Sequence, residues 1–183
     1  MTEKPRALLP VAIILMGVSG SGKSTVAEAL ARRTGFAIED ADAFHPQANI
    51  DKMHAGTPLT DDDRWPWLRA IADAIDRKAE TGWPVIIACS ALKRSYRDVL
   101  VHGRSDVQIV YLRGTRNLIA ARLAGRHGHF MPASLLDSQL AALEEPTPDE
   151  PVVTVDIDAD VEIIVTNIID RLALANAIKE RSR

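Results

Sequence analysis

The chain has 183 residues, which is long enough for a domain with a buried core, and we expect one domain over residues 1–183. Its net charge of −3, with acids and bases interspersed, argues against a nucleic-acid-binding surface. Cys89 is the only cysteine, which excludes an intramolecular disulfide, and no run approaches the roughly 20 apolar residues that span a bilayer, so we expect a cytoplasmic protein outside the membrane.

Apolar runs and helical patterns alternate along the chain, in the order typical of an α/β fold. Strands separated by helices predict a parallel sheet with helices on both faces. In chain order, we expect a strand at 11–17, a helix at 22–34, a strand at 36–40, a short helix around Ile50 and Met53, a helix at 62–80, a strand at 84–90, a helix at 91–101, a strand at 107–112, helices at 115–125 and 132–144, a strand at 151–157 and a helix at 160–177.

The sequence GVSGSGKST, residues 17–25, follows the first strand and leads into the first helix. Its spacing matches a P-loop, in which glycines let backbone N–H groups converge on phosphate oxygens and the helix N-terminus adds its dipole. The alternative is an ordinary Gly/Ser-rich turn, but the lysine, the serine and both flanking elements also match. We therefore expect the phosphates of a nucleotide to bind Gly17, Val18, Ser19, Gly20, Ser21, Gly22, Lys23, Ser24 and Thr25.

Two carboxylates follow the second strand, at Asp40 and Asp42. Ligands of open α/β sheets bind beyond the carboxyl ends of the strands, so both side chains are expected to open onto the P-loop crevice. Alternation along an extended chain would place them on the same side. One could hold Mg²⁺ through its water shell together with Ser24, for which we choose Asp40, while Asp42 accepts a proton from the acceptor hydroxyl. Solvated loop acids are the alternative.

Four segments together resemble the gluconokinase family of small P-loop kinases: MGVSGSGKST, DADAFHPQANIDKMHAGTPLTDDDRWPWL, CSALKRSYRD and RLAGRHGHFMP. The resemblance extends over about residues 11–157. It implies a three-layer P-loop fold with a five-stranded parallel sheet and a small lid, similar to shikimate kinase and nucleoside monophosphate kinases. It also implies ATP-dependent, Mg²⁺-dependent phosphorylation of D-gluconate at its 6-hydroxyl. The family is often dimeric, so a homodimer is one state that the sequence leaves open.

Gluconate is a polyol with one carboxylate, and a site for it needs hydrogen-bonding groups and a cation. The segment at about 42–65 and the CSALKRSYRD stretch supply that mixture. We expect the substrate to contact Asp42, His45, Lys52, Asp63, Arg64, Ser90, Lys93 and Arg97.

Several of these residues also have simpler interpretations. Asp61, Asp62 and Asp63 precede a helix, where acids commonly act as caps, so we expect one to cap while Asp63 or Arg64 faces the substrate. His45 could be structural, and Ser90 could be a helix cap. Lys93 and Arg97 are four apart on the expected helix, which would point both the same way.

Arg122 and Arg126 also have this spacing, and they lie in the segment at about 122–138, where the resemblance places the family's lid. A solvated basic face is the alternative. In the expected mechanism Lys23, Asp42, Arg122 and Arg126 are catalytic: the basic residues stabilise the transferring phosphoryl group, and Asp42 orients the acceptor. The rival functions are a kinase for another small acceptor, and a P-loop ATPase or nucleotide sensor. A GTPase is disfavoured because no N-K-x-D sequence is present.

Overall fold

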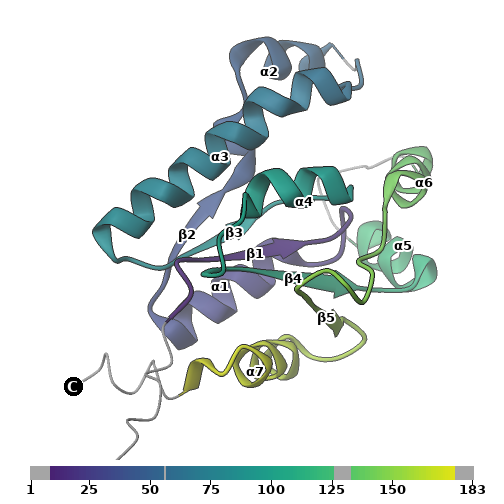
Figure 1. Ribbon diagram of the computed structural model, residues 1–183. Helices are drawn as coiled ribbons and strands as arrows, with labels where there is room; N and C mark the ends of the chain where they lie inside the picture. The colour runs from purple at the N-terminus through teal and green to yellow at the C-terminus, as the bar shows by residue number, and fades with distance from the viewer. Residues whose placement is uncertain (1–8, 56, 126–132, 176–183) are drawn as a thin grey trace, which may run out of the picture.

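The structure is a computed structural model that describes residues 9–55, 57–125 and 133–175. A parallel five-stranded sheet in the order β2-β3-β1-β4-β5 forms its centre (Figure 1). The elements are β1 (Ala12–Met16), α1 (Lys23–Thr34), β2 (Ala37–Asp40), the 3-10 helix η1 (Ala41–Phe44), α2 (Gln47–His54), α3 (Asp61–Thr81), β3 (Val85–Ala88), α4 (Arg94–Val101), β4 (Val107–Arg113), α5 (Arg116–Ala124), α6 (Ala133–Ala142), β5 (Val152–Asp156) and α7 (Val161–Arg171).

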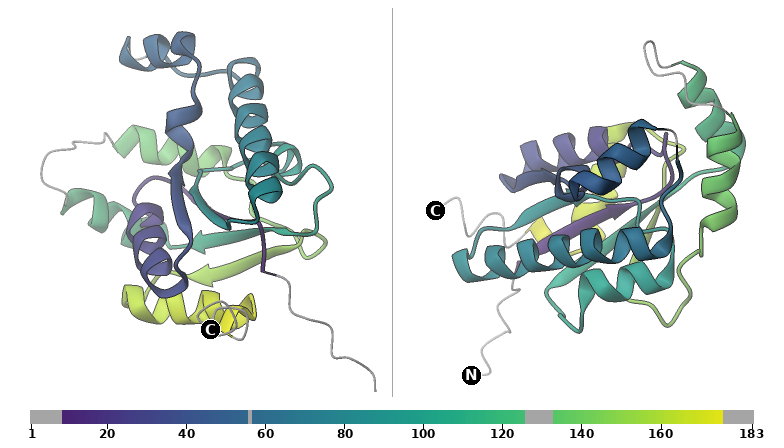
Figure 2. Two further views of the ribbon diagram at one scale, coloured as in Figure 1. Left: turned by 90° about the vertical axis from the view of Figure 1, so that its left-hand side faces the viewer. Right: turned by 90° about the horizontal axis from the view of Figure 1, so that it is seen from above.

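The sheet separates two hydrophobic cores, and the central strand β1 contributes to both. Ile13 and Leu15 join the core beneath α1 and α7, whereas Ile14 and Met16 join the core beneath α3 and α4. The two helix layers lie on opposite sides of the sheet in Figure 2. Every residue of β1 is buried, as expected for a central strand of a parallel sheet with both faces covered. The expected three-layer α/β architecture is confirmed.

Most boundaries of the predicted elements are right to within a few residues, with three informative exceptions. The last helix, expected at 160–177, ends at Arg171, and Ala173 beyond it has a left-handed backbone (φ 52°). The helix expected at 91–101 begins only at Arg94, because Ala91 has a left-handed backbone (φ 45°) that cannot belong to a helix. The 3-10 helix η1 was not expected. Its first turn is held by the side chain of Asp40, which accepts a hydrogen bond from the N–H of Asp42.

The loops that leave β1, β2 and β3 at their carboxyl ends meet on one side of the sheet, near α2, α5 and α6 (Figure 1). Within the described residues, no helix is both long and apolar enough to cross a bilayer. The expected lid at about 122–138 includes residues 126–132, which lie outside the described part of the chain, so the lid remains a prediction.

Candidate active site

The P-loop connects β1 to α1 through backbone conformations that favour glycine. Gly20 and Gly22 have φ angles of 83° and 90°. A Cβ atom on Gly20 would lie 2.7 Å from Cγ of Leu123, and one on Gly17 would lie 2.7 Å from Oγ of Ser21. The chain can therefore make this tight loop only with glycine at these positions.

The loop also positions its lysine. Nζ of Lys23, the first residue of α1, donates hydrogen bonds to the carbonyl oxygens of Gly17 (2.9 Å) and Val18 (3.1 Å). The ammonium group thus lies over the start of the loop, and the N–H groups of the first turn of α1 carry the partial positive charge of the helix dipole. This combination fits a chain of phosphates.

Arg122 approaches the same loop from α5. Its Nη2 donates to the carbonyl oxygen of Ile157 (2.6 Å), and its Nη1 lies 3.7 Å from the position that a Cβ on Gly22 would occupy. Thr115 caps α5, because its hydroxyl accepts a hydrogen bond from the N–H of Leu118. Arg126 lies outside the described residues, so its role stays a prediction.

Asp40 and Asp42 both lie at the end of β2, but they are not arranged as alternation predicts. The chain enters η1 at Ala41, so the carboxylate of Asp40 turns to cap that helix while Asp42 lines a cavity. The buried thiol of Cys89, at the end of β3, has a pKa raised to about 12, mainly by burial, and the charges of Asp40, Asp42 and Lys23 all act on it.

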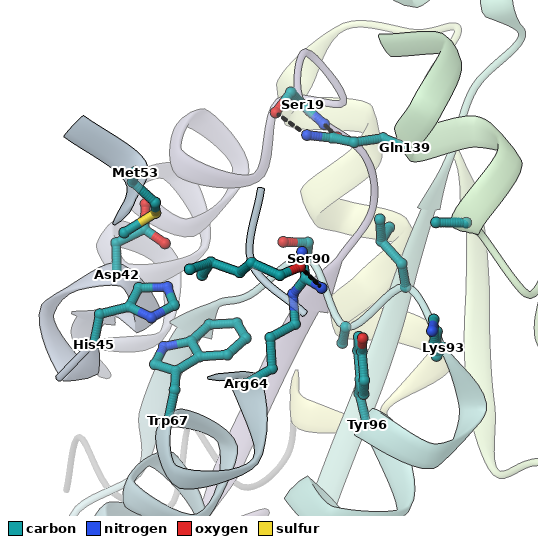
Figure 3. Close-up of a pocket in the computed structure, with 14 residues that line it drawn as sticks. Ser19, Asp42, His45, Met53, Arg64, Trp67, Ser90, Lys93, Tyr96 and Gln139 are labelled. Atoms are coloured by element: carbon teal, nitrogen blue, oxygen red, sulfur yellow. Dashed lines mark hydrogen bonds between the residues drawn. The ribbon is translucent and has the colours of Figure 1, made fainter. Parts of the chain in front are cut away.

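The cavity beside the P-loop has a volume of about 290 Å³ and is lined by polar, aromatic and aliphatic side chains (Figure 3). This volume is near the lower end for small-molecule sites, about 300 Å³, and suits a small ligand. Its lining residues are Ser19, Asp42, His45, Met53, Leu59, Arg64, Trp67, Ser90, Ala91, Leu92, Lys93, Tyr96, Gln139 and Ala142.

One corner of the cavity is an ion-pair cluster centred on Asp61. The Lys93 ammonium donates to both carboxylate oxygens (2.9 and 2.7 Å), and the hydroxyl of Tyr96 donates to one of them (2.6 Å). These bonds lower the pKa of Asp61 and raise that of Lys93. Arg64 lies 3.9 Å from the same carboxylate and donates to the carbonyl oxygen of Leu59 (2.7 Å). The cluster fixes two cations at the cavity wall.

The opposite wall is formed by His45, whose ring stacks on Trp67 with 4.4 Å between centroids and 10° between planes (Figure 3). Trp67 is buried, and its Nε1 donates to the carbonyl oxygen of Ala41 (2.7 Å), which anchors the pair. Burial lowers the pKa of His45. The charge of Asp42 raises this pKa, and the charge of Arg64 lowers it.

The cavity and the P-loop share parts of their walls. The N–H of Gly17 donates to the carbonyl oxygen of Ser90 (3.2 Å), which joins the P-loop to the loop after β3. Gln139 of α6 accepts from the N–H of Ser19 (2.7 Å) and donates to its hydroxyl (3.1 Å) (Figure 3). A ligand in the cavity therefore lies directly beside a phosphate bound in the loop.

Lys52 and Asp63, two of the predicted substrate contacts, face each other instead of the cavity. Their side chains form an ion pair of 2.7 Å. Asp63 also closes a capping box with Thr60, and the bonds from Lys52 and Thr60 lower its pKa to about 2. Of the two alternatives considered for this helix start, Asp63 is the cap and Arg64 faces the cavity.

The prediction that Arg97 contacts the substrate is wrong, because its side chain is buried in the protein and does not line the cavity. It forms a two-pronged ion pair with Glu150, at 2.7 and 2.8 Å, and donates to three carbonyl oxygens in residues 91, 92 and 144. The shared direction expected for Lys93 and Arg97 fails because Lys93 precedes the first helical residue.

Sequence reasoning did not assign Asp61, Tyr96 or Gln139 to the site. The sequence could have indicated Tyr96 as a site residue, since it belongs to the CSALKRSYRD segment and follows Lys93 by three residues. No sequence pattern could have indicated Gln139, because its partner Ser19 is 120 residues away in the chain.

A P-loop with its lysine, an acid at the end of β2 and an adjoining small polar cavity define the chain as a P-loop kinase. A family described as an AAA domain matches residues 13–146. A gluconokinase from Gluconobacter oxydans is 44% identical over 167 residues, which cover 91% of this chain and 94% of that protein. The chain belongs to the gluconokinase family.

The solved structures agree with this membership. A gluconokinase from Sinorhizobium meliloti 1021 superposes with a TM-score of 0.81 at 45% identity, covering 96% of this chain and 99% of the other. Shikimate kinase from Aquifex aeolicus, with a TM-score of 0.58 at 18% identity over 91% of this chain and 98% of the other, shares the fold. The expected similarity in fold to shikimate kinase is confirmed.

Proposed function

We propose that this protein transfers the γ-phosphoryl group of ATP to the 6-hydroxyl of D-gluconate, giving 6-phosphogluconate and ADP. The observation that carries the proposal is the cavity beside the P-loop, which has the carboxylate of Asp42 on one side and Lys93 on the other, with Arg64 between them (Figure 3). A polyol with a carboxylate at one end and a hydroxyl at the other matches that distribution. The named gluconokinases among the relatives support the choice of acceptor.

On the phosphate side, the loop amides, Lys23 and Arg122 act through charge and alignment. The transition state of phosphoryl transfer is loose, so its charge lies mainly on the transferring oxygens. Lys23 is placed by its bonds to the P-loop carbonyls, and Arg122 by its bond to Ile157. We retain Arg126 as a second arginine for this role.

We assign Mg²⁺ to Ser24 and Asp40, where it would neutralise phosphate charge. Hydroxyl and carboxylate oxygens are suitable ligands for this cation, and Mg²⁺ in kinases keeps waters and phosphate oxygens as its remaining ligands. Ser24 and Asp40 are therefore enough as protein ligands for this cation. Because Asp40 also caps η1, we expect it to act through a water molecule.

On the acceptor side, Asp42 orients the 6-hydroxyl and accepts its proton. Arg64 and Lys93 are the cationic side chains at the cavity wall among the described residues, and we assign them to the substrate carboxylate. Lys93 is already paired with Asp61, whereas Arg64 reaches its partners through Nη1 and keeps further donors for a ligand. His45 and Ser90 line the same cavity and bind the intermediate hydroxyls.

The test is ADP release by the purified protein with ATP and Mg²⁺, with and without gluconate. Shikimate, nucleoside monophosphates and other sugar acids serve as competing acceptors, and NMR locates the phosphorylated carbon. Turnover that depends on gluconate, with phosphate on C6, is the expected result. Preference for another acceptor would overturn the choice of substrate, and ATP hydrolysis indifferent to every acceptor would overturn the kinase assignment.

We further propose that the enzyme is cytoplasmic and that it can form a homodimer. Light scattering during size-exclusion chromatography tests the oligomeric state. A dimer of the 20.0 kDa chain should have about twice that mass.

A further inference from the structure

Asn49 on α2 is a buried polar residue next to the cavity, and no role in the reaction has been assigned to it so far. Its side-chain nitrogen Nδ2 lies 3.2 Å from Nδ1 of His45 and 2.8 Å from the carbonyl oxygen of Asp63. The residue is only 4% exposed, so water does not compete strongly for these contacts.

These two contacts determine which ring nitrogen of His45 carries the proton. A backbone carbonyl can only accept, so the atom of Asn49 that faces Asp63 must be the amide nitrogen. The second N–H of that amide then points to Nδ1 of His45, which must accept. A neutral imidazole that accepts at Nδ1 carries its proton at Nε2.

The ring is also held in orientation. It stacks on Trp67, and the indole of Trp67 is anchored to the backbone at Ala41. With Nδ1 bonded to Asn49, the donor that the ring can offer to the cavity is Nε2–H. The lowered pKa of His45 agrees with a neutral ring at ordinary pH. The charged groups that act on the ring are Asp42 and Arg64. Asp63, the residue that caps α3, contacts Asn49 through its backbone carbonyl.

We propose that Asn49 is a positioning residue that holds His45 as an Nε2–H donor to an acceptor hydroxyl. This inference rests on the proposed function, in which the acceptor is a polyhydroxy acid. It adds a specificity device: the wall at His45 offers a donor, and an acceptor molecule without an oxygen at that position leaves the donor unpaired.

The first experiment reads the tautomer directly in the enzyme without substrate. Long-range ¹H–¹⁵N correlation spectra at pH 8 give the state of each histidine ring, and a His45→Gln variant assigns the His45 signals. The expected pattern is a protonated Nε2 and an unprotonated Nδ1. A ring protonated at Nδ1 in the wild-type protein would overturn the proposal without any kinetic measurement.

The second experiment is a double-mutant cycle in substrate kinetics. Asn49→Asp places an acceptor opposite Nδ1, which should reverse the tautomer and raise the KM for gluconate by about tenfold, the value of one hydrogen bond. The KM for ATP should stay within about twofold. His45→Gln keeps an N–H₂ donor near the position of Nε2 and should retain more gluconate affinity than His45→Ala.

In the His45→Gln background, Asn49→Asp should have little further effect on the KM for gluconate, because glutamine has no tautomer to reverse. An equal effect in both backgrounds, or equal changes in the KM for ATP, would mean that Asn49 is merely structural. Should Asn49→Asp fail to fold, the wild-type spectrum and the comparison of His45→Gln with His45→Ala still decide the question. A wild-type enzyme inactive on gluconate would refute the proposed function while leaving the tautomer measurable.

Discussion

The buried ion pair between Arg97 and Glu150 should be among the most sensitive points of the fold. Both side chains are almost completely buried, at 2% and 6% exposure. Replacing Arg97 with leucine leaves a carboxylate in the interior without its cation. It also removes the donor from three carbonyl oxygens, two of them in the loop that carries Ser90 and Lys93.

Breaking a buried pair by removing one partner costs about 3–5 kcal/mol. A domain of this kind has a total unfolding free energy of about 5–15 kcal/mol, so Arg97→Leu should lose a third or more of it in a typical case. The same change should raise the KM for the acceptor, because Arg97 holds the backbone at Ala91, which is in the left-handed region.

The assay is urea unfolding at pH 7 followed by circular dichroism. Arg94→Leu is the matched control, since Arg94 lies on the same helix but pairs with Asp149 at the surface. We expect a much smaller loss for the control. The double variant Arg97→Leu with Glu150→Leu should recover much of the loss, because no uncompensated charge remains. A loss for Arg97→Leu no greater than that of the control would refute the reasoning.

The ion pair should also contribute to the dependence of stability on pH. The bonds from Arg97 hold the pKa of Glu150 below its usual 4.5. A depressed pKa in the folded state means that the contribution is present above 4.5 and is lost as the pH falls through the folded value. The stability difference between the wild type and the double leucine variant should shrink over that acidic range.

Three further predictions concern the site. Lys23→Ala should lower turnover by about 10²–10³ through the loss of one preorganised cation, with an unchanged far-UV spectrum; turnover like that of the wild type would remove Lys23 from the mechanism. Asp42→Asn should lower turnover by about 10²–10⁴ with little change in the KM for ATP, and a change in ATP binding alone would contradict the acceptor role. Iodoacetamide at pH 8 should modify Cys89 far more slowly in the native protein than in urea, because a pKa raised from 9.0 to about 12 reduces the thiolate about a thousandfold; equal rates would show that the thiol is accessible and ionised.

The sequence was sufficient for the parts of the structure that depend on local pattern. The P-loop combines glycine spacing, a lysine and flanking elements within nine residues, so its position and the α/β fold could be predicted together. The cavity residues Asp42, His45 and Arg64 could be placed because the family segment around them is specific. Each depends on a motif that is contiguous in the chain.

The errors arose where a distant residue decides the role of a side chain. Arg97 was expected at the substrate, but its partner Glu150 is 53 residues away, and nothing in the local sequence pairs them. Asp63 was open to two interpretations until the structure placed Lys52 against it. Asp40 and Asp42 do not share a direction, and the cause is local. A short 3-10 helix begins at Ala41 and interrupts the extended chain on which the alternation rule depends.

Four residues of the cavity, Asp42, His45, Arg64 and Trp67, come from the connection that begins with η1 and ends in the first two turns of α3, whereas the phosphate cage comes from the connection between β1 and α1. This part of the acceptor site is therefore encoded apart from the P-loop, although Ser19 of the P-loop and the residues after β3 complete the cavity wall. Grafting the connection from a relative with a different acceptor would change what is phosphorylated and leave the nucleotide machinery in place. Such modularity offers a physical route by which one scaffold could diversify over many small metabolites.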